Sequence, residues 1–297
     1  MQAIFDPKSA YFNVPLLRGA EAVERPADQT TITRRYTEEA IQFITSESDK
    51  PFFLYLAHSM PHVPLFRSPA FEDHSRRGLY GDVVEEVDWS VGHILETLRD
   101  NGLSQDTCVV FTSDNGPWLS QKDHGGSAGL LREGKGTTWE GGMREPTIMW
   151  WPGTIQANAI TSALGCTTDL LATFAALSGA ELPQDRELDS YDLSQVLRGD
   201  PSTPADGPRN VLFYYRGYEL MAVRWGAWKV HYQTQGSYGT EPKKLTKCEP
   251  PELYHLEHDP SELYNIANAH PQVLEAIGRL VEEHQQRLDP APSQLEH

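Results

Sequence analysis

Apolar residues recur at helical spacing in two long stretches of the chain. Between residues 79 and 99, valine, isoleucine and leucine return every three or four positions and acidic residues occupy other positions, which predicts an amphipathic helix. Asn101 and Gly102 then predict the end of this helix. A similar period over Thr30–Ser48 predicts a second helix. Two further helices are expected at Asp169–Leu177 and at Pro271–Leu288.

Short apolar runs between these stretches predict buried strands. The runs Phe52–Leu56, Cys108–Thr112 and Thr147–Trp151 are continuously apolar, as in strands that are covered on both faces. Their alternation with amphipathic helices is typical of an α/β fold, in which helices flank a mainly parallel sheet. Later runs predict antiparallel strands at Val211–Tyr215, Glu219–Trp225 and Trp228–Gln233, the last two joined at Gly226-Ala227.

A change in the sequence pattern near residue 200 predicts that the chain has two structural parts. Pro201, Pro204, Gly207 and Pro208 indicate a linker. We therefore expect an α/β core over residues 1–200 and a small antiparallel subdomain with a closing helix over residues 201–294. The final residues, Leu295-Glu296-His297, resemble the start of an affinity tag and are left out of the fold prediction.

Charge and hydropathy exclude two classes of partner. The chain has 42 acidic and 25 basic residues, a formal net charge of −17, so its long-range field repels phosphate backbones and argues against nucleic acid. Its apolar runs are far shorter than the roughly 20 residues that cross a bilayer, so no membrane span is predicted. Three cysteines allow at most one disulfide.

Asp114 and Asn115 directly follow the strand expected at Cys108–Thr112. Ligands of open α/β sheets bind outside the carboxyl ends of the strands, so this position favours a functional role. Side-chain oxygens of adjacent residues suit Ca²⁺, which takes six to eight oxygen ligands. The alternative is an ordinary turn that is stabilised by Asx hydrogen bonds.

Two histidines and a lysine stand in other loops. His58 and His62 follow the strand expected at Phe52–Leu56, and an imidazole there could bind an anion or protonate a leaving group. Lys135 lies between two glycines, which let a ligand approach the backbone beside a compact positive charge. Glycine follows this lysine, so the loop is not a Walker A sequence. The alternatives are a plain polar contact for either histidine and a surface turn for the lysine.

Three segments together resemble one known family. T-S-D-N-G-P, G-K-G-T-T-W-E-G-G-M-R-E-P and M-P-H-V-P-L have the order and context found in formylglycine-dependent sulfatases, and the resemblance to arylsulfatases is close. It extends from the segment beginning at Tyr36 to the segment that ends at Glu262. It implies an alkaline-phosphatase-like α/β fold with a smaller C-terminal antiparallel sheet.

The resemblance also assigns roles to individual residues. It implies Asp114 and Asn115 as metal ligands for calcium, and His62 and Lys135 as catalytic residues that contact the sulfate group. His124, which precedes two glycines, is implied as a substrate-binding loop residue. Further candidates are His58, Arg132 and Arg144, and the alternative for Arg144 is a structural pair with Glu145.

Parts of the family pattern are missing from this sequence. The C-x-P-S-R or S-x-P-S-R signature, whose first residue becomes formylglycine, is absent, and so is the earlier Asp-Asp pair that supplies further calcium ligands. We therefore interpret the chain as a truncated sulfatase with an incomplete active site, and expect little turnover from it alone. Missing N-terminal strands would expose sheet edges and apolar faces, which a second copy or a complementary N-terminal fragment is expected to cover.

The sequence thus predicts a calcium-dependent sulfuric ester hydrolase acting on a sulfated small molecule or glycan. One alternative is a non-catalytic sulfatase-like protein that binds an anion or a partner. The other is a phosphoryl or phosphonate hydrolase of the same superfamily, and the Lys135 loop favours sulfate over it. Family members are commonly exported to the periplasm, the exterior or the lysosome. The few cysteines and the lack of Asn-x-Ser/Thr acceptors favour a bacterial source.

Overall fold

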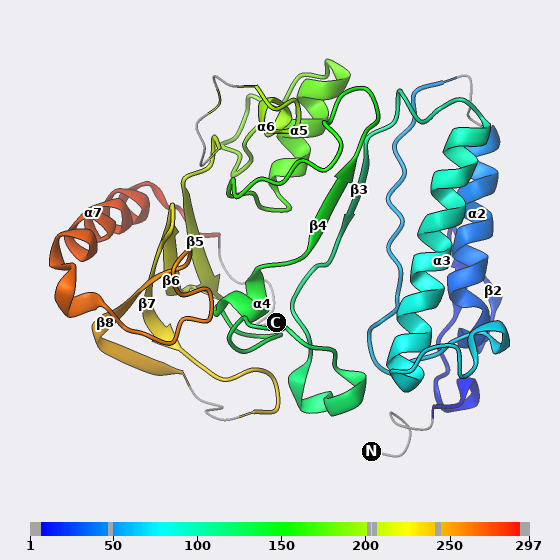
Figure 1. Cartoon of the computed structure of the whole chain (residues 1–297), viewed down its shortest axis with the longest axis horizontal. Coiled ribbons are helices and arrows are strands. Elements are labelled where there is room, and N and C mark those ends of the chain that lie inside the picture. Colours follow the sequence, from blue (N-terminus) through cyan, green and yellow to red (C-terminus); the bar gives the residue numbers. More distant parts are fainter. Residues whose placement is uncertain (1–6, 47–49, 201–202, 204–206, 241–244, 292–297) are drawn as a thin grey trace. The chain divides into compact units, whose positions relative to one another are not determined.

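The computed structural model describes residues 7–46, 50–200, 203, 207–240 and 245–291 (Figure 1). They fall into two compact units. The described residues of the first unit lie within Met1–Val110, Gln121–Gly126 and Met149–Gly153, and those of the second lie within Phe111–Ser120, Ser127–Ile148 and Thr154–His297. Most of the expected linker and the expected tag residues lie outside the described residues. The boundary near residue 200 stays a prediction.

Two long helices dominate the first unit, and they lie side by side in Figure 1. Helix α3 (Gly78–Asp100) agrees with the prediction to within one residue at each end. Helix α2 (Ile32–Ser46) starts two residues later than expected, after a short 3-10 turn, and the expected end at Ser48 lies outside the described residues. The Thr37 hydroxyl donates to the Ser90 hydroxyl at 2.6 Å and joins the two helices. The shorter elements of this unit are η1 (Ser9–Tyr11), β1 (Leu16–Arg18), β2 (Glu21–Glu24), η2 (Gln29–Thr31) and η3 (Pro69–Phe71).

The strand predicted at Phe52–Leu56 is wrong for the described residues. The segment is not part of any sheet, because no neighbouring strand pairs with its backbone there. The Phe52 ring meets Phe43 of α2 with ring centroids 5.7 Å apart, whereas Phe53 and Tyr55 are 70% and 81% exposed. The run is therefore covered on one side instead of two. That a second copy or a complementary fragment covers the other side stays a prediction.

The remaining central strands form a single pair. Strand β3 (Val109–Thr112) pairs with β4 (Thr147–Trp150), and both agree with the predicted runs to within one residue. The residues between them contain the short helical segments η4 (Leu119–His124) and α4 (Glu140–Met143). The mainly parallel sheet expected from the sequence is not seen in the part of the chain that the structure describes.

The second unit contains an antiparallel sheet of four strands in the order β5-β6-β7-β8. Trp225 pairs with Trp228, so the hairpin predicted at Gly226-Ala227 is confirmed. Helix α7 (Pro271–Arg287) follows the sheet, and its Ile277 joins Val230 and Leu253 of the strands in a buried apolar cluster. The strands are β5 (Val211–Arg216), β6 (Glu219–Trp225), β7 (Trp228–Thr234) and β8 (Thr246–His255), and η5 (Ala267–Ala269) precedes α7.

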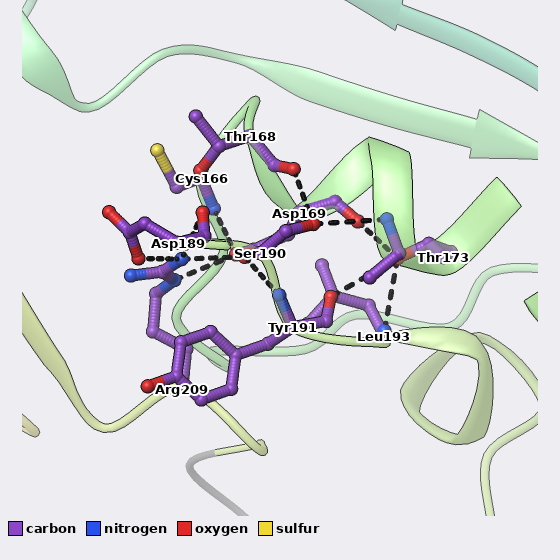
Figure 2. Close-up of polar contacts among 10 residues, drawn as sticks. Cys166, Thr168, Asp169, Thr173, Asp189, Ser190, Tyr191, Leu193 and Arg209 are labelled. Atoms are coloured by element: carbon purple, nitrogen blue, oxygen red, sulfur yellow. Dashed lines mark hydrogen bonds and ion pairs between the residues drawn. The ribbon is translucent and has the colours of Figure 1, made fainter. Parts of the chain in front are cut away.

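A buried ion pair fixes the start of helix α5 (Asp169–Ser178), as Figure 2 shows. The Asp169 carboxylate accepts hydrogen bonds from Arg209 Nε and Nη2 at 2.9 and 2.7 Å. It also accepts the backbone N–H groups of Cys166 and Tyr191, each at 2.8 Å. Burial alone would lower the pKa of Arg209, but its bonds to Asp169 and Asp189 raise it above the usual value. The short helix α6 (Ser194–Leu197) follows α5 along the chain.

Two expectations from composition can be compared with the described residues. None of the helices there combines the length and the apolar character that crossing a membrane requires. Cys108, Cys166 and Cys248 are present as free thiols.

Candidate functional site

The turn after β3 carries the two predicted metal ligands. The Ser113 hydroxyl donates to the Asn115 carbonyl at 3.1 Å, and Asn115 Nδ2 donates to the Gly116 carbonyl at 3.0 Å. These bonds hold the turn and make Oδ1 the Asn115 atom available to a cation. Asp114 is exposed and Asn115 is half-buried. The turn therefore presents a carboxylate and an amide oxygen next to each other.

Residues 130–142, which we call the Lys135 loop, pack against this turn. The Lys135 N–H donates to the Pro117 carbonyl at 2.9 Å, and the Gly116 N–H donates to the Gly142 carbonyl at 3.2 Å. A Cβ on Gly116 would lie 1.8 Å from the Gly141 carbonyl oxygen, so the backbones meet where side chains are absent. The glycines thus allow the loop to lie directly against the turn that carries Asp114 and Asn115.

The Lys135 ammonium lies over an aromatic ring. Its Nζ is 5.3 Å from the centroid of Trp118, a distance at which a cation is attracted to the face of an indole. Trp118 Nε1 donates to the Tyr238 carbonyl at 3.1 Å, and the Tyr238 N–H donates to the Lys135 carbonyl at 3.0 Å. These contacts fix both the ring and the backbone of the lysine.

Glu145 adds a second carboxyl group near the turn. The Thr112 and Thr147 hydroxyls are 2.8 Å apart and join the two facing segments. Asp114 is two residues after Thr112, and Glu145 is two residues before Thr147. Oε1 of Glu145 is buried and has no hydrogen-bond partner. Burial, together with the charge of Asp114, raises the pKa of Glu145 to about 7. Excess negative charge therefore gathers beside the predicted metal ligands.

Glu145→Gln is expected to flatten the pH dependence of stability. The pKa of Glu145 is raised in the folded chain, so its stabilising contribution is present below the ordinary value of 4.5 and is lost as pH rises through about 7. The unaltered chain should therefore lose about 1–2 kcal/mol relative to the variant between pH 5 and 8, allowing for partial solvent exposure. Urea unfolding with a chelator present measures this loss. Exposed Glu249→Gln is the control, and parallel profiles for Glu145→Gln and the unaltered chain would contradict the prediction.

The predicted site residues are divided between the two units. Asp114, Asn115 and Lys135 belong to the second unit, whereas His62 and His124 belong to the first. Convergence of the two histidines on the other three residues stays a prediction. His62 Nδ1 donates to the Val63 carbonyl at 2.7 Å, and His124 ends η4.

His58, Arg132 and Arg144 differ in their surroundings. His58 Nε2 lies 3.2 Å from the Ser90 hydroxyl of α3, and burial lowers the pKa of His58. Arg132 lies over the Trp139 ring at 3.7 Å, within the Lys135 loop. The structural pair predicted between Arg144 and Glu145 is wrong, because Arg144 is exposed and makes no ion pair with Glu145 in the described structure.

Sequence reasoning missed a buried ion cluster beneath the Lys135 loop. Lys229 Nζ lies 2.8 Å from Glu140 Oε1 and 3.2 Å from Glu262 Oε1, and all three side chains are at most 1% exposed. The available signal was a lysine within the apolar strand Trp228–Thr234, since a charge at such a position requires a buried partner.

Comparisons with known proteins agree with the motifs. Residues 6–180 match the sulfatase family, and residues 207–297 match the C-terminal region of aryl-sulfatase. Arylsulfatase A from Homo sapiens is 40% identical over 287 residues, which cover 90% of this chain and 55% of that protein. N-acetylgalactosamine-6-sulfatase from Canis lupus familiaris is 38% identical over 95% of this chain and 60% of its own length. The crystal structure of PsFucS1 sulfatase from Pseudoalteromonas sp. matches with a TM-score of 0.79 and 27% identity, over 88% of this chain and 55% of that one.

The chain therefore belongs to the sulfatase family, whose members are sulfuric ester hydrolases of the alkaline-phosphatase-like fold. It spans little more than half the length of the curated relatives that it matches.

Proposed function

We propose that the second unit carries the cation-binding and sulfate-binding part of a sulfuric ester hydrolase site. The observation that carries the proposal is the direct packing of the Lys135 loop on the Asp114-Asn115 turn, through the hydrogen bonds of Lys135 to Pro117 and of Gly116 to Gly142. This packing places a positive charge and two oxygen ligands on adjoining pieces of backbone. The family membership supports sulfate as the anion.

The residues present fit part of a calcium site. Asp114 and Asn115 offer two hard oxygen ligands, and the buried, unpartnered Oε1 of Glu145 beside them supports a cation at this place. Within the described residues, no group of three or more His, Cys, Asp or Glu side chains could hold a metal, so the turn supplies part of a shell of six to eight oxygens. Calcium bound there would add positive charge toward the sulfate oxygens.

Lys135 is proposed to stabilise the negative oxygens of the sulfate group. Its backbone is held by the bonds to Pro117 and Tyr238 and its ammonium lies over the Trp118 ring, so little rearrangement is needed when charge develops on the transferring group. His62 is proposed to contact the same group and to protonate the leaving alcohol. The family's nucleophile signature is absent from the sequence, so we propose binding, and little turnover, for this polypeptide alone.

Calcium and sulfate titrations of the full chain test the proposal. Isothermal titration calorimetry should show calcium binding that Asp114→Asn weakens at least about tenfold, because one anionic ligand is lost. With calcium present, Lys135→Met should weaken binding of inorganic sulfate roughly tenfold to 100-fold and leave calcium affinity unchanged. An aryl sulfate assay on the same samples should show little hydrolysis.

Matched variants control for charge alone. Asp185→Asn and Lys247→Met change exposed residues that form local ion pairs, so each should leave both affinities unchanged. A chain that binds neither ion would contradict the proposal, and rapid aryl sulfate hydrolysis would show that the site is complete. A sulfated small molecule or a sulfated glycan as substrate, export from the cytoplasm and a bacterial source remain predictions.

A further inference from the structure

The Lys135 loop rests on the C-terminal sheet and on the segment that follows β7. Two side chains of this region, Gln235 and Arg216, donate to the same carbonyl of the loop, that of Gly136. Ser237 binds the Glu133 carboxylate through both its N–H and its hydroxyl, at 3.0 and 2.7 Å. Residues about a hundred positions away along the chain therefore determine the path of the loop.

A buried ion cluster adds further contacts to the loop. Lys229, the second residue of β7, binds Glu140 of the loop at 2.8 Å and Glu262 at 3.2 Å. Oε2 of Glu262 in turn accepts the Glu140 N–H at 2.6 Å, and its Oε1 binds His231 Nε2 at 2.8 Å. Both the backbone and the side chain of Glu140 are thus held, and Arg224 lies 3.7 Å from its second oxygen.

The charges in this cluster balance. Burial alone would raise the pKa of Glu262, but Lys229, His231 and the Glu140 N–H hold it below the usual value. Burial lowers the pKa of His231, so the ring is neutral and the two carboxylates face two cations, Lys229 and Arg224. Replacing such a cluster by apolar residues often leaves stability unchanged or raises it, so stability alone does not explain a buried cluster of this kind.

The cluster acts on the site through two glycines. Glu140 begins α4, and the next residues, Gly141 and Gly142, are those that contact Gly116. The Gly141 N–H also donates to the Arg132 carbonyl at 2.8 Å, which closes the base of the loop. Any displacement of Glu140 is therefore passed to the turn that carries Asp114.

We infer that Lys229 and Glu262 are positioning residues that set the spacing between Lys135 and the Asp114-Asn115 turn. The inference rests on the proposed function of that site. Neither residue contacts the proposed ligands, and both act through Glu140 and the backbone contacts of the loop. The C-terminal sheet is thereby a structural component of the sulfate site.

The test compares variants of the full chain in calcium and inorganic sulfate titrations. Lys229→Met leaves Glu140 without its nearest cation, whereas Lys229→Met combined with Glu140→Gln keeps the net charge of the cluster unchanged. Both variants should bind sulfate about tenfold more weakly, because the loop is no longer held in place. The double variant should fold more stably than the single one, since it buries one fewer unpaired charge. Lys229→Arg, which keeps the cation, should restore most of the affinity.

Val230→Ala is the matched control. Val230 is the next residue of β7, is fully buried in the apolar cluster of the sheet, and belongs to the opposite face. The Val230→Ala substitution should lower the free energy of unfolding and leave sulfate affinity unchanged. Normal sulfate affinity in the double variant would overturn the inference and leave the proposed function intact. Failure of the unaltered chain to bind either ion would overturn both.

Discussion

Asp169→Ala is expected to lower the free energy of unfolding by about 3–5 kcal/mol, because it removes the buried partner of the Arg209 guanidinium and leaves only the exposed Asp189 carboxylate. Arg209 and Asp169 are almost fully buried, and two hydrogen bonds join them. The substitution also removes the hydrogen-bond acceptor of the Cys166 and Tyr191 N–H groups, which donate to the same carboxylate (Figure 2). Urea unfolding followed by circular dichroism measures the change.

Asp185→Ala serves as the control for this prediction. Asp185 forms an ion pair with Arg186 at the surface, with both side chains 66% exposed, so its loss should change stability by less than about 1 kcal/mol. Equal effects of the two substitutions would show that the Asp169 pair adds no more than an exposed one.

Gly116→Ala is expected to disrupt both stability and calcium binding. The new Cβ would lie 1.8 Å from the Gly141 oxygen and 2.9 Å from its carbonyl carbon, and backbone atoms cannot rotate away as a flexible side chain can. Overpacking of this kind costs about 1–3 kcal/mol, and occasionally more. Because the turn and the Lys135 loop must separate, calcium affinity should fall at least about tenfold.

A glycine in open space provides the comparison. Gly92 lies within helix α3, and a Cβ there would meet nothing within 4 Å. Gly92→Ala should therefore stabilise the chain by roughly 0.5–1 kcal/mol and leave calcium binding unchanged. Unchanged calcium affinity in Gly116→Ala would show that the contact between the loop and the turn does not shape the site.

The helices were predictable from sequence because their periodicity is a local property. Helix α3 begins and ends within one residue of the predicted range, and α7 ends one residue before it. Strand β8 was missed, since Pro250 and Pro251 and several charged residues interrupt its pattern. Its place at the edge of the sheet explains why proline is tolerated there.

Longer-range features could not be predicted in the same way. The apolar run at Phe52–Leu56 was expected to be a strand, but strand formation requires a pairing partner, and periodicity says nothing about its presence. The motifs pointed to the segments that carry Asp114, Asn115 and Lys135, and the fold brings these segments together. The cluster of Lys229, Glu140 and Glu262 joins residues that are far apart in sequence, so no local pattern revealed it.

The dependence of the Lys135 loop on a distant sheet limits how the chain can be engineered. A peptide or a graft that copies residues 130–142 into another scaffold would carry the sequence of the loop without the side chains, such as Gln235 and Glu262, that hold its backbone. The same holds for splitting the gene near residue 200. Lys135 and Glu140 would then be on one product, and Lys229, which binds Glu140, would be on the other.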